Sequence, residues 1–166
     1  DERVRRAYWD LERRVLRRCS GVTVTAEGTA ALYRDRYPDF PADRVRVIPN
    51  GFDEQAFEQL PPAIPRSQRR AGPVRFLHSG TLYPYERNPD WFFRALAELR
   101  AEGRLSPETA LFELRGSAHD ECYAPKLAAL GLSDMVRLLP GVPYRDALRE
   151  MTEADVLMLF QADNCN

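Results

Sequence analysis

The chain has 166 residues and a formal net charge of −1, with 44% hydrophobic and 30% charged residues. This balance is ordinary for a globular protein, and the near-neutral charge argues against a nucleic-acid partner. Three cysteines (Cys19, Cys122 and Cys165) lie far apart without metal-ligand spacing, so free thiols are expected and a structural zinc site is not. No apolar run reaches the ~20 residues of a membrane span, and no signal peptide is recognised, which favours a cytoplasmic location.

Residues 1–18 predict an amphipathic helix, because Val4, Tyr8, Leu11 and Val15 fall on one helical face. Seven arginines against four acids in this stretch leave two interpretations open. A solvated face with ion pairs is favoured, because acids are interleaved with the arginines. Attraction to an anionic membrane surface, as peripheral contact, is the alternative.

Two short β runs, at 21–28 and 45–48, flank a helical pattern at 29–37 that runs through Ala31, Leu32 and Tyr37. The Asn50-Gly51 pair that follows is a hairpin signal, but no alternating strand comes after it. The pair is therefore expected to end one α/β unit and to lead into a connector. The proline-rich stretch 60–73 excludes a central strand or a helix interior, so it predicts a linker.

From residue 74 onward, strand and helix patterns alternate, which is typical of a parallel sheet with crossover helices. The fold class predicted is α/β, a Rossmann-like parallel sheet with helices on both faces. The domain prediction is an N-terminal unit at 1–50, a linker at 51–73 and a second, incomplete Rossmann-like domain at 74–166. In the helix expected at 88–103, the apolar side is assigned to Trp91, Phe92, Ala95, Leu96 and Leu99.

Ligands of an open parallel sheet bind beyond the carboxyl ends of its strands. Three of the predicted strands end at a glycine: Gly80, Gly116 and Gly141. Glycine allows a tight turn or a close approach of the backbone to a ligand. These three loops are therefore the candidate binding edge.

The first of these loops leads into a well-marked helix start, with Asn88 as the cap, Pro89 in the first position and Asp90 in the first turn. Free backbone N–H groups and the helix dipole favour a phosphate there, and Arg87 would add a charge-assisted contact. Asp90 opposes this, because its carboxylate lies near the same positive end. The loop has neither the GxGxxG nor the P-loop spacing.

The other two loops offer Ser117 and His119 after the second strand and Val142 after the third. A loop histidine is more often a surface residue than a catalyst. The residues show no nucleophile–histidine–acid spacing and no paired carboxylates. The pattern indicates a phosphate- or nucleotide-binding α/β domain whose catalytic residues are unknown.

The order of motifs resembles the retaining nucleotide-sugar glycosyltransferases of the group 1 type, which have the GT-B fold. The resemblance rests on "CSGVTVTAEGTAALYRDRYP", "RVRVIPNGFDEQAF", "VRFLHSGTLYPYERNPDWFFRALAEL", "LFELRGS" and "LGLSDMVRLLPGVPYRDALREMTEADVLMLF". It covers the chain from about residue 18 to residue 160. The "IPNGFD" and "LGLSDMVRLLPGV" segments are its more specific parts.

This resemblance implies transfer of a sugar from a nucleotide-sugar donor to a carbohydrate or lipid-linked acceptor, without a cofactor. Carried over to this sequence, the donor phosphates would contact Gly80, Thr81, Arg87 and Asn88. The nucleotide would contact the second and third loops, at Gly116, Ser117, Gly141 and Val142. The two cationic phosphate partners of the family fall at Thr81 and Asn88, which are uncharged, and Arg87 would substitute for them.

The family's acidic motif would follow soon after Phe160, so the resemblance also implies a fragment that is inactive alone and exposes apolar faces. A homodimer that buries such faces is a further expectation. Two other functions remain open at this point: a non-catalytic Rossmann-like binding or scaffold module, and a sugar-nucleotide epimerase on the same fold.

Overall fold

The computed structural model describes residues 2–62, 64, 68 and 71–161. The chain divides into two compact units, residues 1–52 and residues 53–165. Cys165 and part of the predicted linker lie outside the described residues. No helix in the described part of the chain combines the length and the apolar character needed to cross a membrane.

The first unit contains a two-stranded parallel sheet and its helices. Its elements are α1 (Glu2–Leu16), β1 (Val22–Val24), α2 (Glu27–Arg36), the 3-10 helix η1 (Ala42–Arg44) and β2 (Val45–Val47). Strand β2 pairs with β1 in parallel, and the backbone N–H of Ile48 donates to the Val24 carbonyl at 2.8 Å. The Asn50-Gly51 pair therefore does not close a hairpin. This confirms the expectation from the sequence, which shows no returning strand after the pair.

The helices of this unit expose more apolar surface than their patterns suggest. Four apolar residues of α1 are about half exposed or more: Val4, Tyr8, Leu11 and Val15. The helix predicted at 29–37 is confirmed as α2, and in it Ala31 and Leu32 are exposed, whereas Ala30 and Tyr37 are buried. The small core instead forms where Val24, Ala30 and Val45 pack together.

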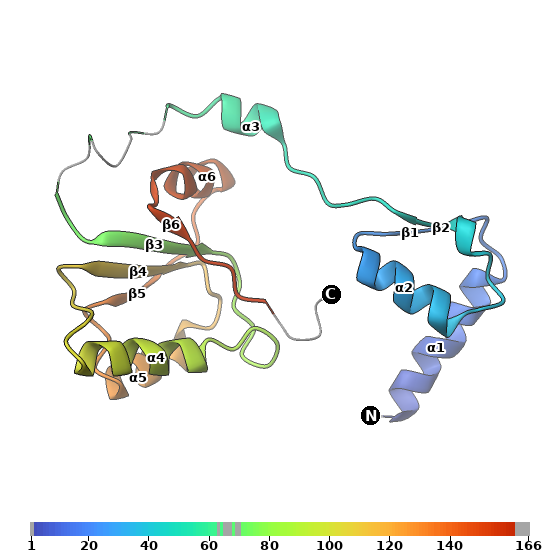
Figure 1. Ribbon diagram of the computed structural model, residues 1–166, viewed down its shortest axis with the longest axis horizontal. Helices are drawn as coiled ribbons and strands as arrows, with labels where there is room; N and C mark the ends of the chain where they lie inside the picture. The colour runs from blue at the N-terminus through green and yellow to red at the C-terminus, as the bar shows by residue number, and fades with distance from the viewer. Residues whose placement is uncertain (1, 63, 65–67, 69–70, 162–166) are drawn as a thin grey trace. The chain divides into compact units, whose positions relative to one another are not determined.

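The second unit is a four-stranded sheet in the order β5-β4-β3-β6, with every pair parallel. Its elements are α3 (Glu54–Glu58), β3 (Val74–Ser79), α4 (Asp90–Ala101), β4 (Ala110–Arg115), α5 (Asp120–Ala129), β5 (Val136–Leu139), α6 (Tyr144–Glu153) and β6 (Val156–Leu157). Helices α4 and α5 cover one face of the sheet and α6 lies on the other (Figure 1). The predicted α/β class and the parallel sheet are confirmed.

The core of the second unit lies between the sheet and helices α4 and α5. Strand β4 has neighbours on both sides, and five of its six residues are buried. In α4 the inward residue is Phe93, which is fully buried, whereas Trp91 is 68% exposed. The assignment of Trp91 to the apolar side is therefore wrong: the true face lies at Phe93 and Leu96, and Phe92 packs at its margin.

Strand β6 is shorter than the predicted run at 155–160, although the backbone N–H of Met158 still donates to the Leu77 carbonyl at 2.8 Å. The residues of β6 that pair in register with β3 are Val156 and Leu157. Phe160, at the end of the run, is nevertheless buried in the core. The run is thus a strand only in its first part, and three of its apolar residues, Val156, Leu157 and Leu159, are exposed.

Candidate functional site

The three glycines of the predicted binding edge lie next to one another at the carboxyl ends of β3, β4 and β5. The N–H of Gly80 donates to the Arg115 carbonyl at 2.9 Å, and the N–H of Gly116 donates to the Leu139 carbonyl at 2.8 Å. A Cβ placed on Gly116 would lie 3.5 Å from the Cα of Gly141. The sheet therefore brings the three loops into one edge, with Gly80 and Gly141 exposed and Gly116 partly covered.

The loop after β3 is fixed by a residue that sequence reasoning missed. Leu82 is fully buried, its N–H donates to the Ser117 carbonyl at 3.1 Å, and its carbonyl accepts from the Tyr123 hydroxyl at 2.9 Å. Burial raises the pKa of Tyr123 to about 12, so its hydroxyl stays protonated and remains a donor. Leu82 thus holds the first loop against the second loop and against helix α5.

The helix start predicted at Asn88 lies one residue later: α4 begins at Asp90, and Pro89, which forms no side-chain cap bond, is its N-cap. The side-chain Oδ1 of Asn88 accepts from the Asp90 N–H at 3.0 Å, and the Pro89 carbonyl accepts from the Phe93 N–H at 3.0 Å. Asn88 Nδ2 also donates to the Asp90 carboxylate at 3.3 Å. Both the oxygen and the nitrogen of the Asn88 side-chain amide are therefore hydrogen-bonded to Asp90, the first residue of α4.

The carboxylate of Asp90 is neutralised by a lysine on the neighbouring helix. Lys126 Nζ lies 2.6 Å and 2.7 Å from its two oxygens. Burial alone would raise the pKa of Asp90, but the hydrogen bonds from Lys126 and Asn88 outweigh it and lower that pKa. The negative charge that would oppose a phosphate at this helix end is therefore compensated.

Arg87 is the cation of this edge that has no ion-pair partner among the described residues. Its charge acts on His78, at the end of β3. Burial is the main cause that lowers the pKa of His78, and Arg87 lowers it further, although the carbonyl groups of Met158 and Gly80 raise it. An unpaired guanidinium beside a glycine loop and a helix N-terminus is a suitable partner for an anion.

His78 is 6% exposed, and its Nδ1 lies 3.1 Å from the Met158 carbonyl. This contact favours the tautomer that carries its proton on Nδ1. The other ring nitrogen, Nε2, is buried and forms no hydrogen bond within the described residues, even though the Gly80 backbone affects the pKa. His78 is thus a neutral ring below the glycine loop, packed edge-on against Phe160.

The loop after β4 presents its backbone rather than the Ser117 side chain. Ser117 is fully buried; its Oγ donates to the Asp120 carboxylate and accepts from the His119 N–H at 3.3 Å. Gly116 and Ala118 both have positive φ, 66° and 64°. Ser117 therefore shapes the turn into α5, and a ligand at this loop would meet backbone groups.

The loop after β5 is positioned by Arg115, the last residue of β4. Its Nη1 donates to the Pro140 carbonyl at 2.8 Å, next to Gly141, while Nε and Nη2 each lie 2.7 Å from the Glu150 carboxylate of α6. Such a two-point contact fixes orientation as well as charge. Arg115 thereby fixes the main chain beside Gly141 and Val142, although sequence reasoning did not single it out.

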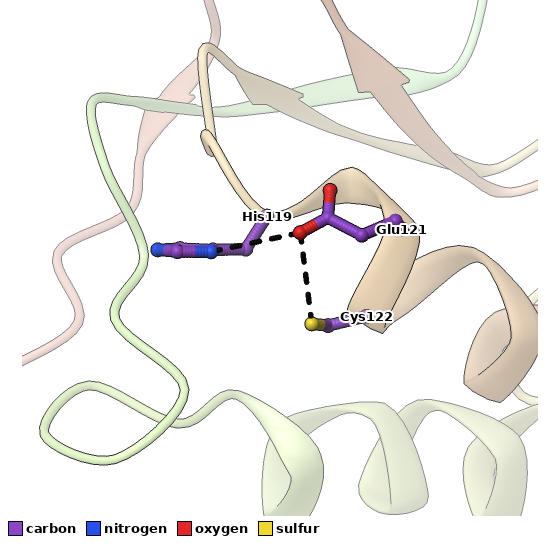
Figure 2. A group of neighbouring side chains, drawn as sticks. All are labelled: His119, Glu121 and Cys122. Carbon is purple, nitrogen blue, oxygen red and sulfur yellow. Dashed lines mark hydrogen bonds and ion pairs between the residues drawn. The ribbon is translucent and has the colours of Figure 1, made fainter.

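One group near this edge has the donor types of a metal site. His119, Glu121 and Cys122 bring their ligand atoms within 4.8 Å of one another, at the start of α5 (Figure 2). His119 Nδ1 and Cys122 Sγ each lie 3.8 Å from the same oxygen of Glu121. The Glu121 side chain is 75% exposed, and all three residues come from one turn of the chain. The contacts are those of side chains at the surface, around one shared carboxylate oxygen of Glu121.

The described side chains of this edge do not form a nucleophile–base pair, and its two buried titratable groups, His78 and Tyr123, point inward. What the described residues of the edge offer is exposed glycine backbone, a helix start with a compensated carboxylate, and the guanidinium of Arg87, which has no ion-pair partner among them. This is equipment for holding an anionic ligand rather than for breaking a bond by itself.

Residues 1–56 match the sequence model of the protein family described as Glycosyltransferase Family 4. This match supports a glycosyltransferase-family protein, and it covers the first unit and four residues beyond it. No curated protein sequence matches the chain. The parallel α/β architecture of both units is consistent with a Rossmann-like glycosyltransferase fold.

Proposed function

We propose that the chain binds the nucleotide-sugar donor of a retaining, group 1 type glycosyltransferase at the carboxyl edge of β3, β4 and β5. The observation that carries this proposal is the meeting of the Gly80, Gly116 and Gly141 loops at one edge. The family match on residues 1–56 supports it independently, because that match lies outside the sheet that carries the edge.

The donor diphosphate would lie along Gly80 and Thr81, at the N-terminal end of α4. The dipole of α4 favours phosphates there, whereas the N–H groups of Gly80 and Asp90 already donate to Arg115 and Asn88. Arg87 supplies the full positive charge, in place of the cations that the uncharged Thr81 and Asn88 do not provide. Asn88 acts through the start of α4, since its amide is already engaged.

The nucleoside would lie toward the second and third loops, where Gly116 and Gly141 leave room for a flat ring to approach the backbone. Val142 is half-buried and offers an apolar contact to the ring. The sugar would then face an acceptor, a carbohydrate or a lipid-linked carbohydrate, across a cleft. Holding both substrates in line is how such a transferase gains most of its rate.

The test is calorimetry of the chain with uridine and guanosine diphosphates, each compared with its monophosphate. We expect one diphosphate to bind, and its monophosphate to bind more weakly because the second phosphate is lost. Arg87→Gln should weaken diphosphate binding by about tenfold or more, because a hydrogen bond to a charged group is worth about 1.5–3 kcal/mol.

Arg137→Gln is the matched control, because Arg137 is exposed on β5 and has no ion-pair partner among the described residues. Equal losses in the two variants would show that only overall charge matters. No heat with either diphosphate at millimolar concentration would refute the donor site and favour a scaffold module without nucleotide chemistry.

A further inference from the structure

A basic site lies in the first unit, whereas the edge described above belongs to the second unit. A cavity of about 650 Å³ is formed by the last turns of α1 and α2 and by the chain that leads into η1. Both helices end here, and both strands of this unit begin here. The cavity therefore lies at the amino ends of β1 and β2, the edge opposite to the one where parallel sheets bind their substrates.

Four arginines line this cavity: Arg13, Arg17, Arg36 and Arg44. Asp39 is the one acidic residue in the lining. The side chains of Arg17 and Arg44 form no ion pair or hydrogen bond within the described part of the chain. Two unpaired guanidinium groups beside two further arginines repel one another unless an anion lies among them.

Arg36 is already held in place for such an anion. Its Nη1 lies 3.1 Å from a carboxylate oxygen of Glu12, which also accepts from the hydroxyls of Tyr33 and Tyr37. The guanidinium carbon of Arg36 is 5.8 Å from the centre of the Trp9 ring. A guanidinium fixed on one side needs less ordering when its free side binds a ligand.

The charge around the cavity exceeds what the helix ends require. Helix C-termini each carry about half a negative charge, so two of them account for roughly one arginine. The lining has four arginines against one carboxylate, Asp39, and two of these arginines, Arg13 and Arg36, pair with Asp10 and Glu12 outside it. The uncompensated positive charge of the lining therefore lies at Arg17 and Arg44.

We propose that the cavity formed by Arg13, Arg17, Arg36 and Arg44 binds a phosphate group. The planar fork of arginine matches phosphate oxygens two at a time. The remaining lining includes the rings of Tyr37 and Phe40, so the body attached to the phosphate would meet apolar and aromatic surface. This site shares no residue with the proposed donor site, and the evidence for it does not depend on the donor site.

Two sources can present such a phosphate: a soluble phosphorylated compound or the headgroup of an anionic lipid. The second is compatible with α1, where the half-exposed Leu11 and Val15 lie beside Arg14 and Arg18 on the adjoining surface. The chemistry recognised by the four arginines is the same in both cases. The experiment separates the sources.

Cys19 gives a local readout, because its thiol lines the cavity and is partly exposed. Cys122 lies in the second unit and reports on that unit separately. The rate of maleimide labelling at each cysteine is followed by peptide mass spectrometry on the whole chain. The probes are inorganic pyrophosphate, vesicles of phosphatidylglycerol mixed with phosphatidylcholine, and vesicles of phosphatidylcholine alone.

We expect pyrophosphate or the phosphatidylglycerol vesicles to slow Cys19 labelling several-fold, whereas phosphatidylcholine does not. Arg17→Gln combined with Arg44→Gln should raise the concentration needed for protection at least tenfold. These two side chains are exposed and unpaired, so the double variant is expected to fold. The double variant Arg46→Gln with Arg137→Gln removes the same charge from exposed strand positions and should keep the protection.

Protection by pyrophosphate identifies a soluble phosphorylated ligand, protection only by the phosphatidylglycerol vesicles identifies a lipid headgroup, and protection by both identifies a site that accepts either. The proposal is overturned if neither probe protects Cys19 in the unmodified chain. It is equally overturned if the control double variant loses protection to the same extent, because the effect would then be general charge.

Discussion

The hydroxyl of Tyr123 offers the sharpest test of how the first loop is held. Tyr123→Phe removes one oxygen and keeps the ring, so packing against Phe93, whose ring centroid is 6.1 Å away, is retained. The Leu82 carbonyl loses its 2.9 Å partner in a place where both residues are fully buried and water cannot replace it. Leaving a buried acceptor unpaired costs about 1–3 kcal/mol.

We therefore expect Tyr123→Phe to lower the free energy of unfolding of the second unit by about 2 kcal/mol, close to a thirtyfold change in its folding equilibrium. For a unit of this size the thermal midpoint should fall by roughly 8 °C. Urea titration followed by Trp91 fluorescence, in a Trp9→Phe background, measures this unit alone. Tyr144→Phe, at a ring that is 64% exposed, is the matched control. A loss below about 0.5 kcal/mol in Tyr123→Phe would refute the view that Leu82 is held through this bond.

Two further predictions concern the same edge. Gly116→Ala should lower the free energy of unfolding by about 1–2 kcal/mol, because an alanine is strained at the φ of +66°. Sterically the new Cβ would make only ordinary contact with the Cα of Gly141 at 3.5 Å, so φ is the main cause. Ala118→Gly, at φ 64°, should raise the free energy of unfolding instead. Equal effects of the same sign in urea titrations of both variants would contradict this account of the turn. Because the pKa of His78 is lowered in the folded chain, the unfolded chain takes up a proton on this ring at a higher pH than the folded chain does. The contribution of His78 to stability is therefore fully present above about pH 6.5 and is lost as the pH falls through the folded pKa. Denaturation between pH 7.5 and pH 5 should show a steeper loss in the unmodified chain than in His78→Phe, and parallel curves would argue against a neutral, buried His78.

The elements of the second unit could be predicted because local pattern and global fold agree there. The run Val74–Ser79 and the run Ala110–Arg115 are apolar, β-branched or aromatic in large part, and each is followed by glycine and a helix signal. The side of a helix that faces the core is less certain from one sequence. Trp91 and Phe93 are both large and apolar, and only the direction of approach of α4 to the sheet decides that Phe93 is inside.

The glycines of the candidate site could be predicted from the sequence, but the residues that hold their loops in place could not. Strand-ending glycines are visible in the sequence, and the parallel sheet then requires them to share an edge. Leu82, Tyr123 and Arg115 act through contacts between residues 25 to 41 positions apart. No spacing rule connects such positions. The one available signal was the presence of a tyrosine in the helical segment that forms α5, because a buried tyrosine hydroxyl needs a partner.

These supports bear on the proposal that an edge with little formal charge holds a diphosphate. Binding by backbone N–H groups demands that the loops already lie in position, because each loop that must be ordered on binding subtracts from the affinity. Tyr123 and Ser117 fix the first loop through Leu82, and Arg115 fixes the third through the Pro140 carbonyl. Arg87 then adds a positive charge beside loops that are already held in position. An edge of this kind loses affinity through its supports as well as through its contacts, so Tyr123→Phe should weaken diphosphate binding although Tyr123 touches no ligand.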